Sequence, residues 1–73
     1  MEKLKISMTP DGVLLSGNRR GLLGLAEICT ALANLPESRE ESRKLGNHYH
    51  YAEDMNNVEP ESIEMEILYD PEM

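Results

Sequence analysis

Residues 19–35 carry the clearest periodicity in the sequence, and its period is that of an amphipathic helix. Apolar side chains recur every three or four positions and would share one broad face: Leu22, Leu25, Ile28, Cys29, Leu32 and Leu35. Asn18 precedes the segment as a natural N-cap, and Pro36 ends it. A helix with a single apolar face must cover another apolar surface, so the rest of the chain has to supply a sheet. Because Cys29 lies on the apolar face of this helix, we predict that it is a small buried apolar residue and not a reactive thiol.

Strand patterns flank the helix on both sides. Residues 3–8 alternate polar and apolar, and Thr9-Pro10-Asp11-Gly12 then forms a tight turn into a second strand at 13–16. Residues 47–52 (NHYHYA) and 62–69 (SIEMEILY) alternate in the same way. The order ββαββ predicts an α+β fold, with one four-stranded antiparallel sheet and one amphipathic helix packed on one face.

The polar segment 37–47 (ESREESRKLGN) connects the helix to the third strand. This segment has two possible interpretations. Glu40 and Lys44 are spaced for an i,i+4 ion pair if a short helix forms here. A solvated, mobile connector fits its composition equally well.

The short chain limits what the fold can contain. Residues 1–73 make one domain, and without Trp or Phe its core must come from Leu, Ile, Val and Met. Such a thin core does not support a deep substrate pocket. The single cysteine rules out an internal disulfide and a cysteine-rich zinc site. No nucleophile–base pair and no phosphate-binding loop can be assembled, so we expect neither an enzyme nor a cofactor.

The charge distribution favours a basic protein partner. The formal net charge is −7, and the residues from Glu53 to the C-terminus include eight acids and no Lys or Arg. Such a segment repels nucleic acid and anionic membranes. The alternative is that the acids serve solubility alone. The first residues (MEKLKISM) lack a signal peptide, and the apolar stretch 22–35 is too short to span a bilayer, so a cytoplasmic location is expected.

His48 and His50 form the sharpest local motif. Imidazoles two residues apart on a strand point to the same side, a spacing that metal sites use. The competing interpretation is a cross-strand polar row facing Glu64 and Glu66. The sequence does not decide whether the histidines or the tyrosines of this strand face the helix.

Arg19 and Arg20 lie in the first turn of the predicted helix, where positive charge opposes the helix dipole. These arginines either form a binding site for an anion or form ion pairs with the abundant acids of the protein. We expect the ion pairs.

Three segments together resemble the immunity protein 32 family of bacterial polymorphic toxin systems. They are SGNRRGLLGLAEICTALA (16–33), NHYHYA (47–52) and the acidic strand at 61–69. The resemblance implies an antitoxin that binds and blocks a toxin domain. Since many toxin domains are cationic nucleases, an acidic inhibitor would suit such a partner.

The leading hypothesis is therefore a non-enzymatic immunity protein that contacts its toxin through acidic residues on the fourth strand and its approach. The expected contact residues are Glu53, Asp54, Glu59, Glu61, Glu64 and Glu66. A second hypothesis is a homodimeric interaction module, with Leu68, Tyr49 and Tyr51 at the interface if they share a face. A third is a small metal-binding domain centred on His48 and His50.

Overall fold

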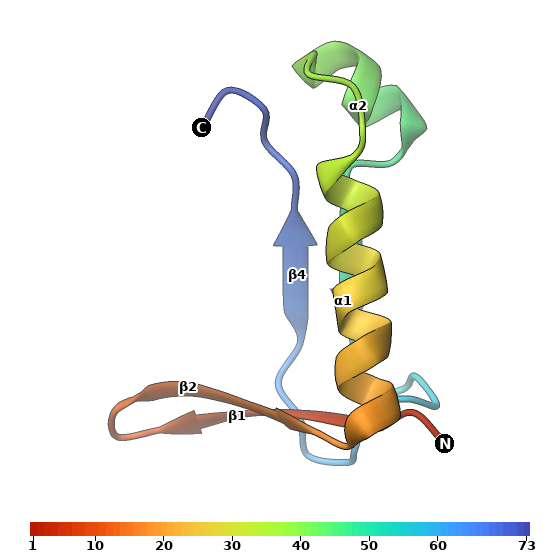
Figure 1. Ribbon diagram of the computed structural model, residues 1–73. Helices are drawn as coiled ribbons and strands as arrows, with labels where there is room; N and C mark the ends of the chain where they lie inside the picture. The colour runs from red at the N-terminus through yellow and green to blue at the C-terminus, as the bar shows by residue number, and fades with distance from the viewer.

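A computed structural model describes all 73 residues and confirms the α+β class. Figure 1 shows a long helix beside a strand ribbon, with a hairpin crossing below them. Neither helix is long and apolar enough to cross a membrane. The elements in chain order are β1 (Leu4–Thr9), β2 (Gly12–Gly17), α1 (Arg19–Ala33), α2 (Arg39–Leu45), β3 (His48–Tyr51) and β4 (Met65–Leu68).

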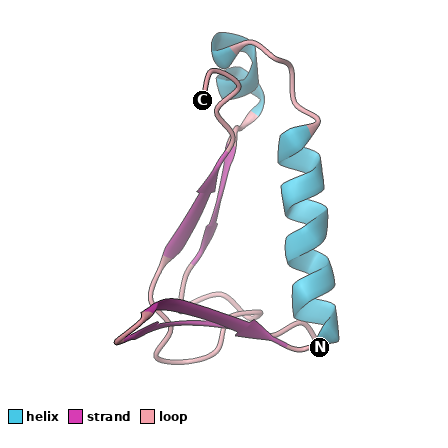
Figure 2. Cartoon of the chain, turned by 60° about the vertical axis from the view of Figure 1, so that its left-hand side comes forward, coloured by secondary structure: helices cyan, strands magenta, loops and turns pink.

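The strands form two separate sheets, so the prediction of one four-stranded sheet is wrong. β1 pairs with β2, and β3 pairs with β4, both antiparallel. Figure 2 shows the two ribbons crossing at a steep angle, with α1 alongside the β3–β4 ribbon. The element order is ββααββ, because a second helix forms between α1 and β3.

The strands form two sheets because the edge of β1 that does not pair with β2 is already occupied. The Leu4 N–H donates to the Asn57 carbonyl at 2.9 Å, and the Glu59 N–H donates to the Leu4 carbonyl at 2.7 Å. Further along, the Ile63 N–H donates to the Ile6 carbonyl at 2.9 Å. An irregular segment thus occupies the edge that β3 or β4 would need in order to join β1 in one sheet.

This segment cannot continue as a regular strand. Pro60 has no N–H to donate to a ladder, and Glu61 adopts a left-handed backbone with φ of 67°. β4 consequently begins only at Met65, three residues later than predicted, and Ile63 precedes it with 38% of its surface exposed.

The core lies where the hairpin, the β3–β4 ribbon and the segment after β3 meet. Its buried members are Leu4, Ile6, Tyr51 and Val58. The Tyr49 and Tyr51 rings pack 5.0 Å apart, and burial raises the pKa of the Tyr51 hydroxyl. The tyrosine row of β3 therefore faces the interior, and the histidine row faces outward.

The rest of the protein covers fewer apolar side chains of α1 than the sequence predicts. Leu32 is buried and Leu25 packs against the core, but Leu22 is 46% exposed and Cys29 is exposed as well. The prediction of a buried Cys29 is wrong because a two-stranded ribbon covers less of a helix than a four-stranded sheet would. The helix also ends at Ala33, two residues before its predicted end.

Segment 37–47 forms a short capped helix. The Ser38 hydroxyl accepts from the Glu41 N–H, and Gly46 takes the left-handed conformation that ends the helix, with φ of 90°. The predicted Glu40–Lys44 pair is present at 3.5 Å. The predicted short helix in this segment is therefore confirmed, and it runs from Arg39 to Leu45.

The start of α1 is fixed to the start of β1. The Asn18 side-chain oxygen accepts from the Gly21 N–H at 2.8 Å and from the Lys3 N–H at 3.1 Å. Its side-chain amide donates to the Met1 carbonyl at 2.7 Å. The helix backbone approaches Lys3 so closely that a β-carbon at position 21 would lie 2.8 Å from the Lys3 carbonyl carbon. This position therefore requires glycine.

We expect Gly21→Ala to destabilise the fold by roughly 1–3 kcal/mol, the typical cost of forcing extra atoms into a packed site. Gly24→Ala is the matched control, because its β-carbon would meet only the movable end of the Glu2 side chain, 2.9 Å away. There the better helix propensity of alanine should stabilise the protein by up to about 1 kcal/mol. Urea unfolding measures both free energies, and a Gly21→Ala protein as stable as the wild type would contradict this packing.

The C-terminal residues are held by α2, and this contact should depend on pH. The Arg39 guanidinium lies 3.1 Å from the Asp70 carboxylate. The Glu72 N–H and Arg39 hydrogen bonds lower the pKa of Asp70 from its ordinary 3.8. A lowered pKa adds stability above the unfolded-state value, and this stability is lost as the pH falls through the folded-state value.

Asp70→Asn should accordingly lower the melting temperature at pH 7 by a small amount, and the difference from wild type should vanish well below pH 3.8. Thermal melts from pH 7 down to pH 2 measure this difference, with Glu37→Gln as the control variant, because Glu37 is exposed and forms no ion pair. A difference that persists at the lowest pH would show that Asp70 does not act through its charge.

Candidate functional site

The six acids predicted to contact a partner all lie between the end of β3 and the middle of β4. We call residues 53–66 the acidic segment. It leaves β3 at the lower end of the ribbon, passes beneath the hairpin and returns upward as β4 (Figure 1). Buried Val58 anchors it to the core, and its hydrogen bonds to β1 fix its path.

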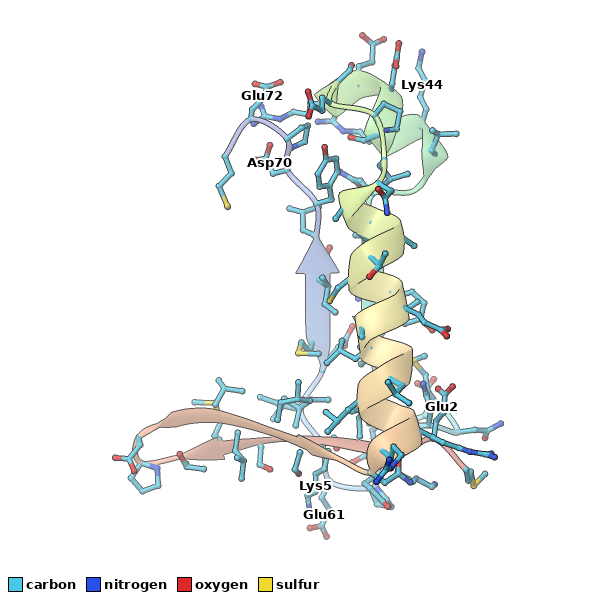
Figure 3. All side chains as sticks on the ribbon, in the orientation of Figure 1. Glu2, Lys5, Lys44, Glu61, Asp70 and Glu72 are labelled. Atoms are coloured by element: carbon cyan, nitrogen blue, oxygen red, sulfur yellow. The ribbon has the colours of Figure 1, made fainter.

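Two of the acids meet in the loop part of this segment. The Glu53 carboxylate accepts a hydrogen bond of 2.6 Å from the Glu61 N–H. The Glu61 side chain projects downward beneath the hairpin (Figure 3). Glu53, Asp54 and Glu61 are all exposed, so this loop presents negative charge to solvent.

Two more acids surround an imidazole on the outer face of the β3–β4 ribbon. His50 Nδ1 lies 3.2 Å from Glu64 Oε2, and His50 Nε2 lies 4.0 Å from Glu66 Oε2. His50 and Glu66 are direct cross-strand partners. The predicted cross-strand contact with Glu64 and Glu66 is therefore confirmed for His50, whereas the cross-strand partner of His48 is Leu68.

His48 lies beside His50 on the same outer face. The two ring centroids are 5.3 Å apart in an edge-to-face arrangement. One ligating atom each of His48, His50 and Glu66 can be chosen so that all three lie within 4.8 Å of one another. These residues are the ones in the chain that could hold a metal ion.

The sixth acid, Glu59, is separated from the others. It lines a shallow open hollow on the underside of the hairpin together with Lys3 and Lys5. The Lys3 ammonium donates to the Asn56 carbonyl at 3.2 Å, beside this hollow. Glu59 thus faces a surface of mixed charge, a feature that the sequence pattern does not reveal.

The acids of this segment are not neutralised by the protein's own bases. Arg39 pairs with Asp70 and Glu72, the last two acids of the chain. None of the six acids of the acidic segment forms an ion pair with Lys or Arg, and His50 is the only basic side chain in contact with any of them. Apart from Glu59, which shares its hollow with Lys3 and Lys5, these acids therefore present their negative charge to solvent.

The arginines at the start of α1 do not neutralise the acids of the acidic segment either. Arg19 and Arg20 are exposed, and neither forms an ion pair. The prediction that they pair with the protein's acids is wrong, because no carboxylate lies within ion-pair distance of either guanidinium group.

The dimer interface predicted from Leu68, Tyr49 and Tyr51 does not form one surface. The tyrosines pack against the core, whereas Leu68 is 59% exposed on the opposite face, directly across from His48. The physical reason is strand alternation: Tyr49 pairs with Ile67, so the residue after Ile67 must point the other way.

One comparison with known proteins identifies a family. A family model described as immunity protein 32 matches residues 12–69, which run from the start of β2 through the end of β4. No curated protein and no solved structure matches the chain. The match includes the whole acidic segment and both histidines, and it confirms the resemblance seen in the sequence. Immunity proteins neutralise toxins and are typically non-enzymatic, as we predicted for this chain. Because the match covers well over half of its residues, the chain belongs to the immunity protein 32 family.

Proposed function

We propose that this protein neutralises a cognate toxin by binding a basic surface of that toxin through the acidic segment. The observation that carries this proposal is the set of acids that have no Lys or Arg partner within the protein. In most acidic proteins surface acids are interspersed with bases, which limits the local field. Here six acids within one stretch of chain have no Lys or Arg ion pair, and only Glu59 shares a hollow with lysines.

The acidic segment, together with the end of β4, can supply both charge and apolar contact. Exposed Leu68 lies on the outer face of the ribbon with Glu66, and partly exposed Ile63 lies next to Glu64. Protein interfaces commonly combine an apolar centre with a charged rim. In this arrangement the apolar side chains contribute to the lifetime of the complex, and the acids guide the toxin into position.

The partner chemistry follows from the charge. A toxin domain that cuts nucleic acid must present a cationic surface, because it binds phosphates. An acidic inhibitor placed over that surface excludes the substrate without catalysing anything. Opposite charges also accelerate association by about 10- to 1,000-fold, and a cell needs its inhibitor to bind the toxin quickly.

Charge reversal at Glu64 and Glu66 tests the proposal. The Glu64→Lys/Glu66→Lys variant should associate with the toxin at least about tenfold more slowly, while dissociation changes less, because exposed rim charges act mainly on the association rate. Stopped-flow or surface plasmon resonance at low and high salt measures both rates. A chelator in the buffer keeps metal ions out of the comparison.

The matched control is Glu27→Lys/Glu37→Lys, which changes the net charge by the same amount at exposed acids outside the acidic segment. It should slow association much less. Equal slowing by both double variants would show that only the total charge matters, and unchanged rates in the first variant would exclude Glu64 and Glu66 from the contact.

A further inference from the structure

We propose that the outer face of the β3–β4 ribbon is a binding site for a divalent transition-metal ion such as Zn²⁺. Its ligands are the Nε2 atoms of His48 and His50 and the carboxylate of Glu66. The site shares Glu66 with the proposed toxin-binding surface, but the argument for it does not depend on toxin binding and rests on three features of the ribbon.

The first feature is convergence. His48 and His50 project to the same side of β3, and Glu66 lies directly across from His50 on β4. One potential ligating atom of each residue, a ring nitrogen or a carboxylate oxygen, lies within 4.8 Å of one such atom of the other two. Bonds of about 2.0–2.2 Å to one ion require ligand atoms roughly 3.3 Å apart in a tetrahedral site. Side-chain rotation can supply this contraction, because all three residues are exposed.

The second feature is the orientation of the imidazoles. His50 Nδ1 lies 3.2 Å from Glu64 Oε2, and His48 Nδ1 lies 3.3 Å from Asn47 Oδ1. Both neighbours are oxygen acceptors, so each Nδ1 carries the proton in these hydrogen bonds. Each neutral ring then has an unprotonated Nε2 that is ready to ligate.

The amide orientation of Asn47 is itself fixed. Its side-chain N–H donates to the Tyr69 carbonyl at 3.4 Å, which turns its oxygen toward His48. Metal-binding histidines commonly donate their second N–H to a carboxylate or a carbonyl oxygen, and these partners set both the tautomer and the ring direction. Glu64 and Asn47 occupy these two supporting positions.

The third feature is the chemistry of the donor set. Two imidazoles and a carboxylate suit Zn²⁺, Ni²⁺ or Cu²⁺, whereas Mg²⁺ and Ca²⁺ prefer sites made of oxygen ligands. No Lys or Arg pairs with Glu64 or Glu66, so no fixed positive charge competes with the ion. Three protein ligands leave one coordination position for water or for a side chain of a bound protein.

Calorimetric titration of the untagged protein with zinc chloride tests the site. We expect one ion per chain. His48→Ala and His50→Ala should each weaken binding at least about tenfold, and Glu64→Ala, which removes the acceptor of the supporting His50 hydrogen bond, should weaken it by roughly 10- to 100-fold. Glu27→Gln is the control for a lost surface acid and should leave the affinity unchanged. Magnesium chloride should give no binding.

Long-range ¹H–¹⁵N NMR of the histidine rings identifies the ligating atom directly. Zinc should shift the Nε2 resonances of both rings and leave the Nδ1 atoms protonated. Backbone spectra of the variants check that they fold. We expect them to fold, because the substituted side chains are exposed. Unweakened zinc binding in the two histidine variants, equal binding of magnesium, ligation through Nδ1, or no zinc binding to the wild type would each overturn the proposal.

Discussion

The hydrogen bonds along the second edge of β1 hold this small fold together. β1 pairs with β2 on one side, and on the other it binds the irregular segment 57–63 through the backbone of Leu4 and Ile6. The side chains of these same residues are the most buried aliphatic groups in the protein. One strand therefore links the hairpin to the β3–β4 ribbon and supplies much of the core. A chain with so few buried residues depends strongly on any single element of this kind.

The position of the acids follows from this constraint. Because the segment between β3 and β4 is bound to β1, its charged side chains are turned outward in a fixed arrangement and are not spread over a mobile loop. Two of the bases pair with acids outside this segment, since Arg39 holds the C-terminal residues and Lys44 pairs within α2, and Lys3 binds the backbone carbonyl of Asn56. Folding thus leaves the six acids of the acidic segment without a Lys or Arg ion pair, and in our proposal a basic toxin supplies the positive charge.

Features with local causes could be predicted from the sequence. The hairpin follows from strand alternation and the Thr9–Gly12 turn, and the start of α1 follows from its Asn18 cap. The caps Ser38 and Gly46 would also have indicated α2. The division into two sheets could not be predicted, because it depends on a segment without strand alternation pairing with β1 some fifty residues earlier in the chain. The exposure of Cys29 follows from that division. Of the candidate site, the acids were evident in the sequence, whereas their lack of ion pairs required the structure.

The central claim is that the acidic segment is the surface that contacts the toxin. Hydrogen–deuterium exchange of the protein, alone and in complex with the toxin captured from its native host at low salt, tests it most directly. The account predicts a basic partner that raised salt releases, and slower exchange at amides of residues 53–66 in the complex. Slower exchange confined to α1 or to the tip of the β1–β2 hairpin, with residues 53–66 unchanged, would contradict it.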